Sequence, residues 1–174
     1  VLGLYLPRVS FRPAQYPSFH PGKCAEVLSA DEVLGVFGEL HPLVKAHYAF
    51  NDAPVLVAEL DGEKLLGMAS IIFQIEPILG FPPVIEDIAV IVDEQVSAAE
   101  LENVIRQSGG NLLKAVRLFD IYRDEKIGAG KKSMAYNLTY QAADRTLTDK
   151  DAATVRNRIV RALEKAFGAV LRSS

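Results

Sequence analysis

The order of helix and strand signals between residues 88 and 172 limits the possible folds more than any other feature of this chain. Apolar or alternating runs typical of strands occur at 88–92, 115–122, 132–141 and 168–172. Two helices are predicted between them, and each begins with a capping box, Ser97 with Glu100 and Thr148 with Asp151. The predicted order is therefore strand, helix, strand, strand, helix, strand.

This order is that of the split βαβ arrangement, known as the ferredoxin-like fold, with an antiparallel sheet. The segment IEPILGFPP (75–83) precedes it and holds three prolines and one glycine, which is typical of a domain boundary. We therefore predict an α+β chain with two domains, residues 1–78 and 79–174. The first is predicted to be part of a mixed or antiparallel sheet module. Its expected elements are a hairpin, a short helix and a buried strand, at 25–28 with 33–40, 41–50 and 55–60.

Side-chain alternation separates the two faces of the C-terminal sheet, because successive side chains of a strand point to opposite faces. The helix-covered face is predicted to hold Ile88, Val90, Val92, Phe119, Ile121, Met134, Tyr136, Leu138 and Tyr140. The open face is predicted to hold Ala89, Asp120, Tyr122, Ser133, Ala135, Asn137 and Thr139. The open face thus combines an acid, an aromatic ring, hydroxyls and an amide.

Such a face suits a flat polar ligand. A base of single-stranded RNA can stack on Tyr122 while Asp120 or Ser133 meets the hydrogen-bonding groups on its edge. From alternation alone, an ordinary solvated sheet surface or a subunit contact is the simpler interpretation, since this fold hosts many unrelated functions.

A second candidate surface for nucleic acid is the last predicted helix. The segment 149–172 carries six Lys or Arg against three Asp or Glu, although the whole chain has a net charge of −3. Arg158, Arg161 and Lys165 fall on one face of that helix at three- and four-residue spacing. They could contact RNA phosphates, which position a nucleic acid without reading its sequence. A solvated helix face is the plain alternative.

The sequence GAGKKS (128–133) resembles the end of a phosphate-binding loop but lacks its pattern. The motif G-x-x-x-x-G-K-[ST] would need a glycine where Glu125 stands and a hydroxyl residue where Lys132 stands. A strand is predicted to follow, whereas the motif must open a helix. We therefore interpret this segment as a hairpin loop.

No catalytic or metal-binding constellation is predicted. His41 and His47 are six residues apart, which excludes the i, i+4 pairing of a helical metal site. The single Cys24 excludes an internal disulfide and suits a reducing compartment. No apolar run approaches the ~20 residues that a membrane helix needs, and the N-terminus has no signal-peptide pattern. We expect a piece of a longer chain, with no membrane association.

Several motifs resemble the beta subunit of bacterial phenylalanyl-tRNA synthetases, in the same order and over nearly the whole chain. They are FHPGKCAEVL (19–28), GELHP (38–42), FPPVIEDIAVIVDE (81–94), LFDIY (118–122), GKKSMAY (130–136), DRTLTD (144–149) and GAVLR (168–172). The resemblance implies that residues 1–78 end the subunit's non-catalytic, synthetase-like module. It implies that residues 79–174 are its ferredoxin-fold anticodon-binding domain.

The family's organisation sets further expectations. The alpha subunit carries the aminoacylation site within an (αβ)₂ tetramer, so this piece is expected to have no catalytic residue, no metal and no cofactor. ATP and Mg²⁺ would bind elsewhere in the intact cytoplasmic ligase, and tRNA-Phe would be the partner. The alternative is a ferredoxin-like protein-interaction or regulatory module that does not bind RNA.

The resemblance also assigns roles. The family's contacts to the first anticodon base fall on Ala89, Asp120, Tyr122 and Ser133, which alternation places on the open face. One departure is Glu86-Asp87, where the family commonly has Arg-Asp. If that arginine holds the RNA backbone, this chain loses one favourable contact and gains a repulsion.

Overall fold

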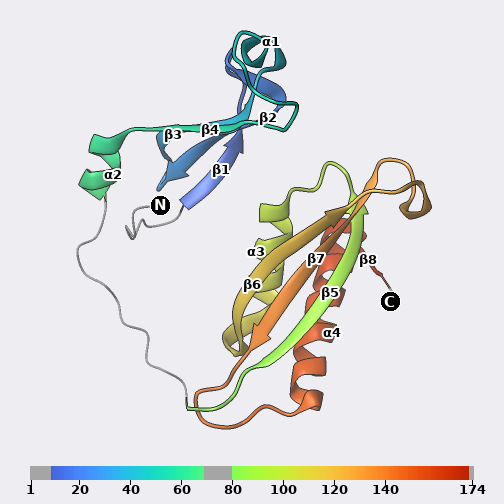
Figure 1. The fold of residues 1–174 in the computed structure, drawn as a ribbon. Coiled ribbons are helices and arrows are strands. Elements are labelled where there is room, and N and C mark those ends of the chain that lie inside the picture. The colour runs from blue at the N-terminus through green and yellow to red at the C-terminus, as the bar shows by residue number, and fades with distance from the viewer. Residues whose placement is uncertain (1–8, 69–79, 173–174) are drawn as a thin grey trace. The chain divides into compact units, whose positions relative to one another are not determined.

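The computed structural model describes residues 9–68 and 80–172 (Figure 1). The chain divides into two compact units, Val1–Glu76 and Pro77–Ser174. Each unit has its own antiparallel sheet of four strands among the described residues.

The first unit is a meander of four strands in the spatial order β1-β2-β3-β4. Its elements are β1 (Val9–Pro13), β2 (Phe19–Ser29), β3 (Glu32–Leu40), α1 (Pro42–Lys45), β4 (Leu56–Leu60) and α2 (Gly62–Met68). Ala30 and Asp31 join β2 to β3 and both have positive φ, as a two-residue turn of type I′ requires. This confirms the predicted hairpin, although its first strand begins six residues earlier than expected.

Two details of this unit differ from prediction. The helix α1 begins with Pro42 as expected but ends at Lys45, since only one turn forms. The strand β4 is not buried, because it pairs only with β3 among the described residues and so lies at a sheet edge. Its first residue, Leu56, is 79% exposed. An apolar run indicates a buried strand only where both sides are covered.

The second unit confirms the predicted order of strands and helices. Its elements are β5 (Val84–Asp93), α3 (Ala98–Gly109), β6 (Leu113–Tyr122), β7 (Lys131–Tyr140), α4 (Asp149–Phe167) and β8 (Val170–Leu171), with two short 3-10 turns, η1 (Gly110–Leu112) and η2 (Glu125–Ile127). The sheet order is β6-β7-β5-β8 with antiparallel neighbours. Both helices lie on one side of the sheet, which leaves the other side open (Figure 1).

The helices begin where their caps predict. The Ser97 hydroxyl accepts from the Glu100 backbone N–H at 3.2 Å, and the Glu100 carboxylate accepts from the Ser97 backbone N–H at 2.8 Å. Thr148 and Asp151 make the equivalent pair at the start of α4. The last strand is shorter than the predicted range 168–172. Gly168 adopts a left-handed conformation as the C-cap of α4, so β8 begins only at Val170.

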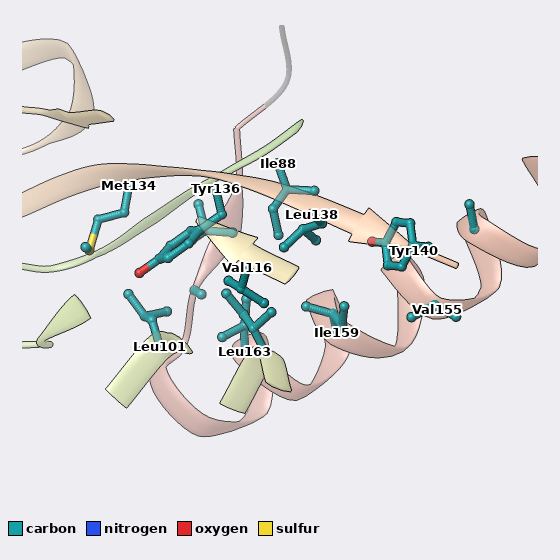
Figure 2. Close-up of a cluster of buried hydrophobic side chains, with 14 of the residues drawn as sticks. Ile88, Leu101, Val116, Met134, Tyr136, Leu138, Tyr140, Val155, Ile159 and Leu163 are labelled. Carbon is teal, nitrogen blue, oxygen red and sulfur yellow. The ribbon is translucent and has the colours of Figure 1, made fainter. Parts of the chain in front are cut away.

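The core lies between the sheet and the two helices. The predicted inward residues of β7, namely Met134, Tyr136, Leu138 and Tyr140, are fully buried. Figure 2 shows Met134 and Tyr136 near Leu101 of α3, and Leu138 near Ile88 of β5 above Ile159 and Leu163 of α4. Because β7 is the second strand of four, it is paired along both edges. The core residues of α3 and α4 pack against its inner face, so these four side chains have no exposed surface.

A β-bulge in β6 corrects one predicted orientation. Leu118 pairs with Tyr136, yet Asp120 pairs with the next residue of β7, Ala135, so Phe119 is an extra residue. Phe119 was expected to point to the core, but it is 53% exposed. The insertion of one residue resets the alternation, and Ile121 pairs with Met134 on the helix side. Ile121 is nevertheless 41% exposed, so the prediction that it is a core residue is wrong.

Candidate nucleic-acid interface

Strand register brings the four predicted base contacts together on the open face. Ala89 of β5 and Asp120 of β6 both pair with Ala135 of β7, so they form one row across three strands. Tyr122 pairs with Ser133, two residues along the same strands. Residues two apart on a strand share a face and lie about 6.6 Å apart. Ala89, Asp120, Tyr122 and Ser133 therefore make a single patch, called here the open-face patch.

Tyr122 has the exposed ring that base stacking needs, since it is 42% exposed. Its hydroxyl donates a hydrogen bond to the Asp124 carboxylate at 3.0 Å. This bond, together with the negative charge of Asp124, raises the pKa of Tyr122, so the phenol stays neutral at physiological pH. The guanidinium carbon of Arg172 lies 5.3 Å from the ring centroid, within the range of a cation–π contact.

Asp120 offers the hydrogen-bonding group of the patch. Its side chain is exposed, and among the described residues it forms no ion pair. An ionised carboxylate only accepts hydrogen bonds, so Asp120 can meet a base that presents N–H donors on its edge. Ala89 and Ala135 in the same row have small side chains and leave room above the sheet.

Ser133 lies on the predicted face but is not open, because only 2% of it is exposed. Its neighbours on either side in the register, Tyr122 and Ile91, both have much larger side chains. A serine between two such residues is covered by them. A base therefore reaches the Ser133 hydroxyl only when a neighbouring side chain moves.

A cavity of about 390 Å³ lies beside the patch, within the usual range for ligand pockets. Ala89 is the only member of the patch that lines it. Phe119, Arg156 and Arg172 also line it, and none of them was selected as a base contact from the sequence. The bulge that exposes Phe119 leaves no clear mark in the alternation, and Arg172 is distant from β6 in sequence.

The basic face of α4 is separate from this patch. The helix packs its buried stripe against the inner side of the sheet, so Arg158, Arg161 and Lys165 belong to the helix layer rather than the open face. Arg158 has a structural partner, since its guanidinium donates to the Gly109 carbonyl at the end of α3 at 2.7 Å. These residues cannot contact the same base as Tyr122, and their phosphate contact stays a prediction.

Glu86 lies away from the open face. It pairs with Leu138, whose side chain is in the core, and its carboxylate accepts from the Arg156 guanidinium at 3.3 Å. Glu86 therefore does not belong to the open-face patch, and its repulsion of an RNA backbone stays a prediction. Asp87 is the open-face neighbour, and it accepts a hydrogen bond from Asn137 at 2.8 Å.

Two of the three histidines in the first unit have local hydrogen-bond partners. His20 and His41 each accept, through Nδ1, a backbone N–H two residues later, from Gly22 and Leu43. In the ranges 9–68 and 80–172, no group of three or more His, Cys, Asp or Glu could hold a metal ion. No helix in the same ranges is long and apolar enough to span a membrane.

Comparison with known families places the second unit in a defined class. Residues 80–172, more than half of the chain, match the family described as ferredoxin-fold anticodon binding domain. The chain therefore belongs to that family. Residues 1–62 match the family described as phenylalanyl tRNA synthetase beta chain CLM domain.

The chain is also similar to curated phenylalanine–tRNA ligase beta subunits. It is 42% identical over 165 residues to that of Geobacillus kaustophilus, which covers 95% of this chain and 20% of the relative. It is 43% identical over 170 residues to that of Symbiobacterium thermophilum, covering 98% of this chain and 19% of the relative. The chain thus spans about a fifth of the length of these relatives.

Proposed function

We propose that this chain is the C-terminal part of a phenylalanine–tRNA ligase beta subunit and that its second unit binds the anticodon of tRNA-Phe. One observation carries the proposal. In a domain of the anticodon-binding family, register places Ala89, Asp120, Tyr122 and Ser133 side by side on the sheet face that the helices leave open.

Each residue of the patch has a distinct task in this proposal. Tyr122 stacks on the base, a contact that every base can make. Asp120 accepts hydrogen bonds from the base edge and so discriminates between bases. Ala89 leaves space for the base, and Ser133 supplies a further hydrogen bond once its cover moves.

The remaining functions belong to the intact enzyme. We propose that an alpha subunit performs ATP- and Mg²⁺-dependent aminoacylation in an (αβ)₂ tetramer in the cytoplasm, and that this piece supplies scaffold and tRNA recognition without catalysis. The similarity to ligase beta subunits supports this organisation. It supports RNA binding rather than the alternative of a protein-interaction module.

The test is a titration of the 174-residue chain with tRNA-Phe and with tRNA-Phe substituted in the anticodon. We expect weaker binding to the substituted tRNA. Tyr122→Ala should weaken binding of the native tRNA by roughly tenfold, since stacking contributes ~1–3 kcal/mol per base. Asp120→Asn should reduce the difference between the two tRNAs. Equal binding of both tRNAs, unchanged by either substitution, would contradict the proposal.

A further inference from the structure

We infer a second nucleotide subsite on the open face, next to the open-face patch, in which Phe119 is the stacking platform. Its ligand is the nucleotide adjacent to the one on Tyr122 in the same single-stranded RNA. This inference rests on the proposed function and extends it from one base to two.

The orientation of Phe119 follows from the pairing of its neighbours. Leu118 pairs with Tyr136 on the helix side, so the next residue, Phe119, points to the open face, and the β-bulge lets Asp120 point to that face as well. The extra residue leaves Phe119 half exposed and places it with Ala89 and Ala135, which belong to the open face. A large aromatic ring that is half exposed is available for contact with a second flat ring.

The space beside Phe119 is suited to a base. The cavity of about 390 Å³ has the small side chains of Ala89 and Ala135 in its lining, so nothing bulky from β5 or β7 fills it there. Two residues with polar side chains, Asp87 of β5 and Asn157 of α4, also line it, so the cavity extends from the open face past the edge of β5. The Asp87 carboxylate accepts a hydrogen bond from the Asn137 amide at 2.8 Å.

Arg172 connects the two subsites. Its backbone N–H donates to the Ala89 carbonyl at 2.8 Å, which anchors this residue at the edge of β5. From that anchor its side chain lines the cavity of Phe119 and also lies over the ring of Tyr122. A guanidinium that contacts the Tyr122 ring and belongs to the residues lining the cavity of Phe119 is placed to bind the phosphate that joins two successive nucleotides. Arg156 also lines the cavity, but its charge is already paired with Glu86.

These features favour single-stranded RNA over a duplex. A duplex keeps its bases stacked on one another, whereas the bases of a loop can be splayed out onto aromatic side chains. Phe119 and Tyr122 are three residues apart on one strand, so two neighbouring bases of one loop can reach both rings.

The experiment is a binding matrix between protein variants and modified RNAs. The RNAs are the anticodon stem-loop of tRNA-Phe and three versions in which one anticodon nucleotide at a time is abasic. The proteins are the 174-residue chain, Phe119→Leu, Tyr122→Leu and the control Ile85→Ala. Leucine keeps apolar bulk without a ring. Ile85 is a large exposed side chain, paired with Thr139, that does not line the cavity. Circular dichroism and thermal unfolding check that each variant is folded.

We expect Phe119→Leu to weaken binding of the unmodified stem-loop by roughly 5- to 150-fold, as loss of one stacked base would, while Ile85→Ala leaves it unchanged. On one abasic RNA the Phe119→Leu effect should vanish, because its partner base is absent. The Tyr122→Leu effect should vanish on a different abasic RNA.

The outcomes separate this inference from the proposed function. If Tyr122→Leu weakens binding but Phe119→Leu does not, the second subsite is wrong and the anticodon proposal stands. The second subsite is also wrong if both effects vanish on the same abasic RNA, since the two rings would then contact one base. If neither variant nor any abasic substitution changes binding, both proposals fail.

Discussion

The guanidinium of Arg172 lies 5.3 Å from the centroid of the Tyr122 ring, although Tyr122 ends one edge strand of the sheet, β6, and Arg172 follows the other, β8. The Arg172 side chain therefore reaches across the open face. It brings a positive charge to the ring that we propose for base stacking.

Replacement of Arg172 should weaken RNA binding and reduce its dependence on salt. Arg172→Ala removes one cation, so the slope of log K against log salt should become shallower by about 0.7, the value for one phosphate contact to a single strand. Arg172→Lys keeps the charge but loses the planar group that stacks on Tyr122. It should restore the slope without restoring all of the affinity.

This prediction is checked by titrating the anticodon stem-loop at several salt concentrations. Lys114→Ala is the matched control, because Lys114 is an exposed cation at the opposite end of β6 from Tyr122. A slope that changes equally in Lys114→Ala and Arg172→Ala would show that only the net charge matters.

The titration of Tyr122 should depend on Asp124. The hydrogen bond to Asp124 and the carboxylate's negative charge both favour the neutral phenol and raise the pKa of Tyr122, whereas Arg172 acts in the opposite direction. Asp124→Asn removes the charge, yet its amide oxygen can still accept the Lys126 N–H that caps η2. The pKa of Tyr122 should therefore fall towards its ordinary value of about 10.

The measurement is a pH titration of ring-labelled tyrosine by NMR, with Tyr122→Phe used to assign the signal. An unchanged pKa in Asp124→Asn would mean that Asp124 is not the group that raises the pKa of Tyr122. A rise in the pKa of Tyr122 would mean that the Asp124 carboxylate lowers this pKa instead of raising it.

The cap of α4 should contribute measurably to stability. Thr148→Ala removes the hydroxyl that accepts the Asp151 backbone N–H, and such a loss typically lowers the free energy of unfolding by about 1 kcal/mol. Thr146→Ala is the matched control, because Thr146 is exposed and lies outside the helix. Urea unfolding followed by circular dichroism compares the two, and equal losses would argue against the cap.

The same cap should make stability depend on pH. The side-chain bonds from Arg145, and then those of Thr148, hold the pKa of Asp151 well below its usual range in the folded protein. In the unfolded chain the ordinary value is about 3.9. Because the folded pKa is the lower one, this contribution is present above that value and is lost as the pH falls towards the folded pKa.

We therefore expect Asp151→Asn to be less stable than the parent at neutral pH and the difference to shrink under acid conditions. Urea unfolding at about pH 7, 4 and 2.5 follows the difference from well above the ordinary pKa to below it. A difference that stays constant across this range would show that the carboxylate's charge is not involved.

Substitution of Glu86 by arginine should lower the stability of the second unit. Glu86 accepts from Arg156 on the helix side of the sheet, so Glu86→Arg would set two cations against each other there. We expect a lower unfolding temperature for Glu86→Arg, measured by circular dichroism. Glu86→Gln removes the charge without adding another, so its stability should fall between those of the parent and Glu86→Arg. An unfolding temperature of Glu86→Arg equal to that of the parent would contradict this prediction.

The predictable part of this protein follows from local rules. Alternation placed Met134 and Tyr136 inside, because the period of a strand requires neighbouring side chains to point to opposite faces. The starts of α3 and α4 follow from their capping boxes, because each cap satisfies backbone N–H groups within one turn.

Tertiary structure decided the features on which the second subsite depends. The bulge at Phe119 is defined by its pairing with β7, so the reversed orientation of that ring cannot be derived from β6 alone. The burial of Ser133 depends on Tyr122 and Ile91 of neighbouring strands. Arg172 reaches Tyr122 only because sheet order brings the end of the chain back beside β5. A strand's own sequence thus determines which residues can share a face, whereas the contacts across that face depend on the register of strands distant in sequence.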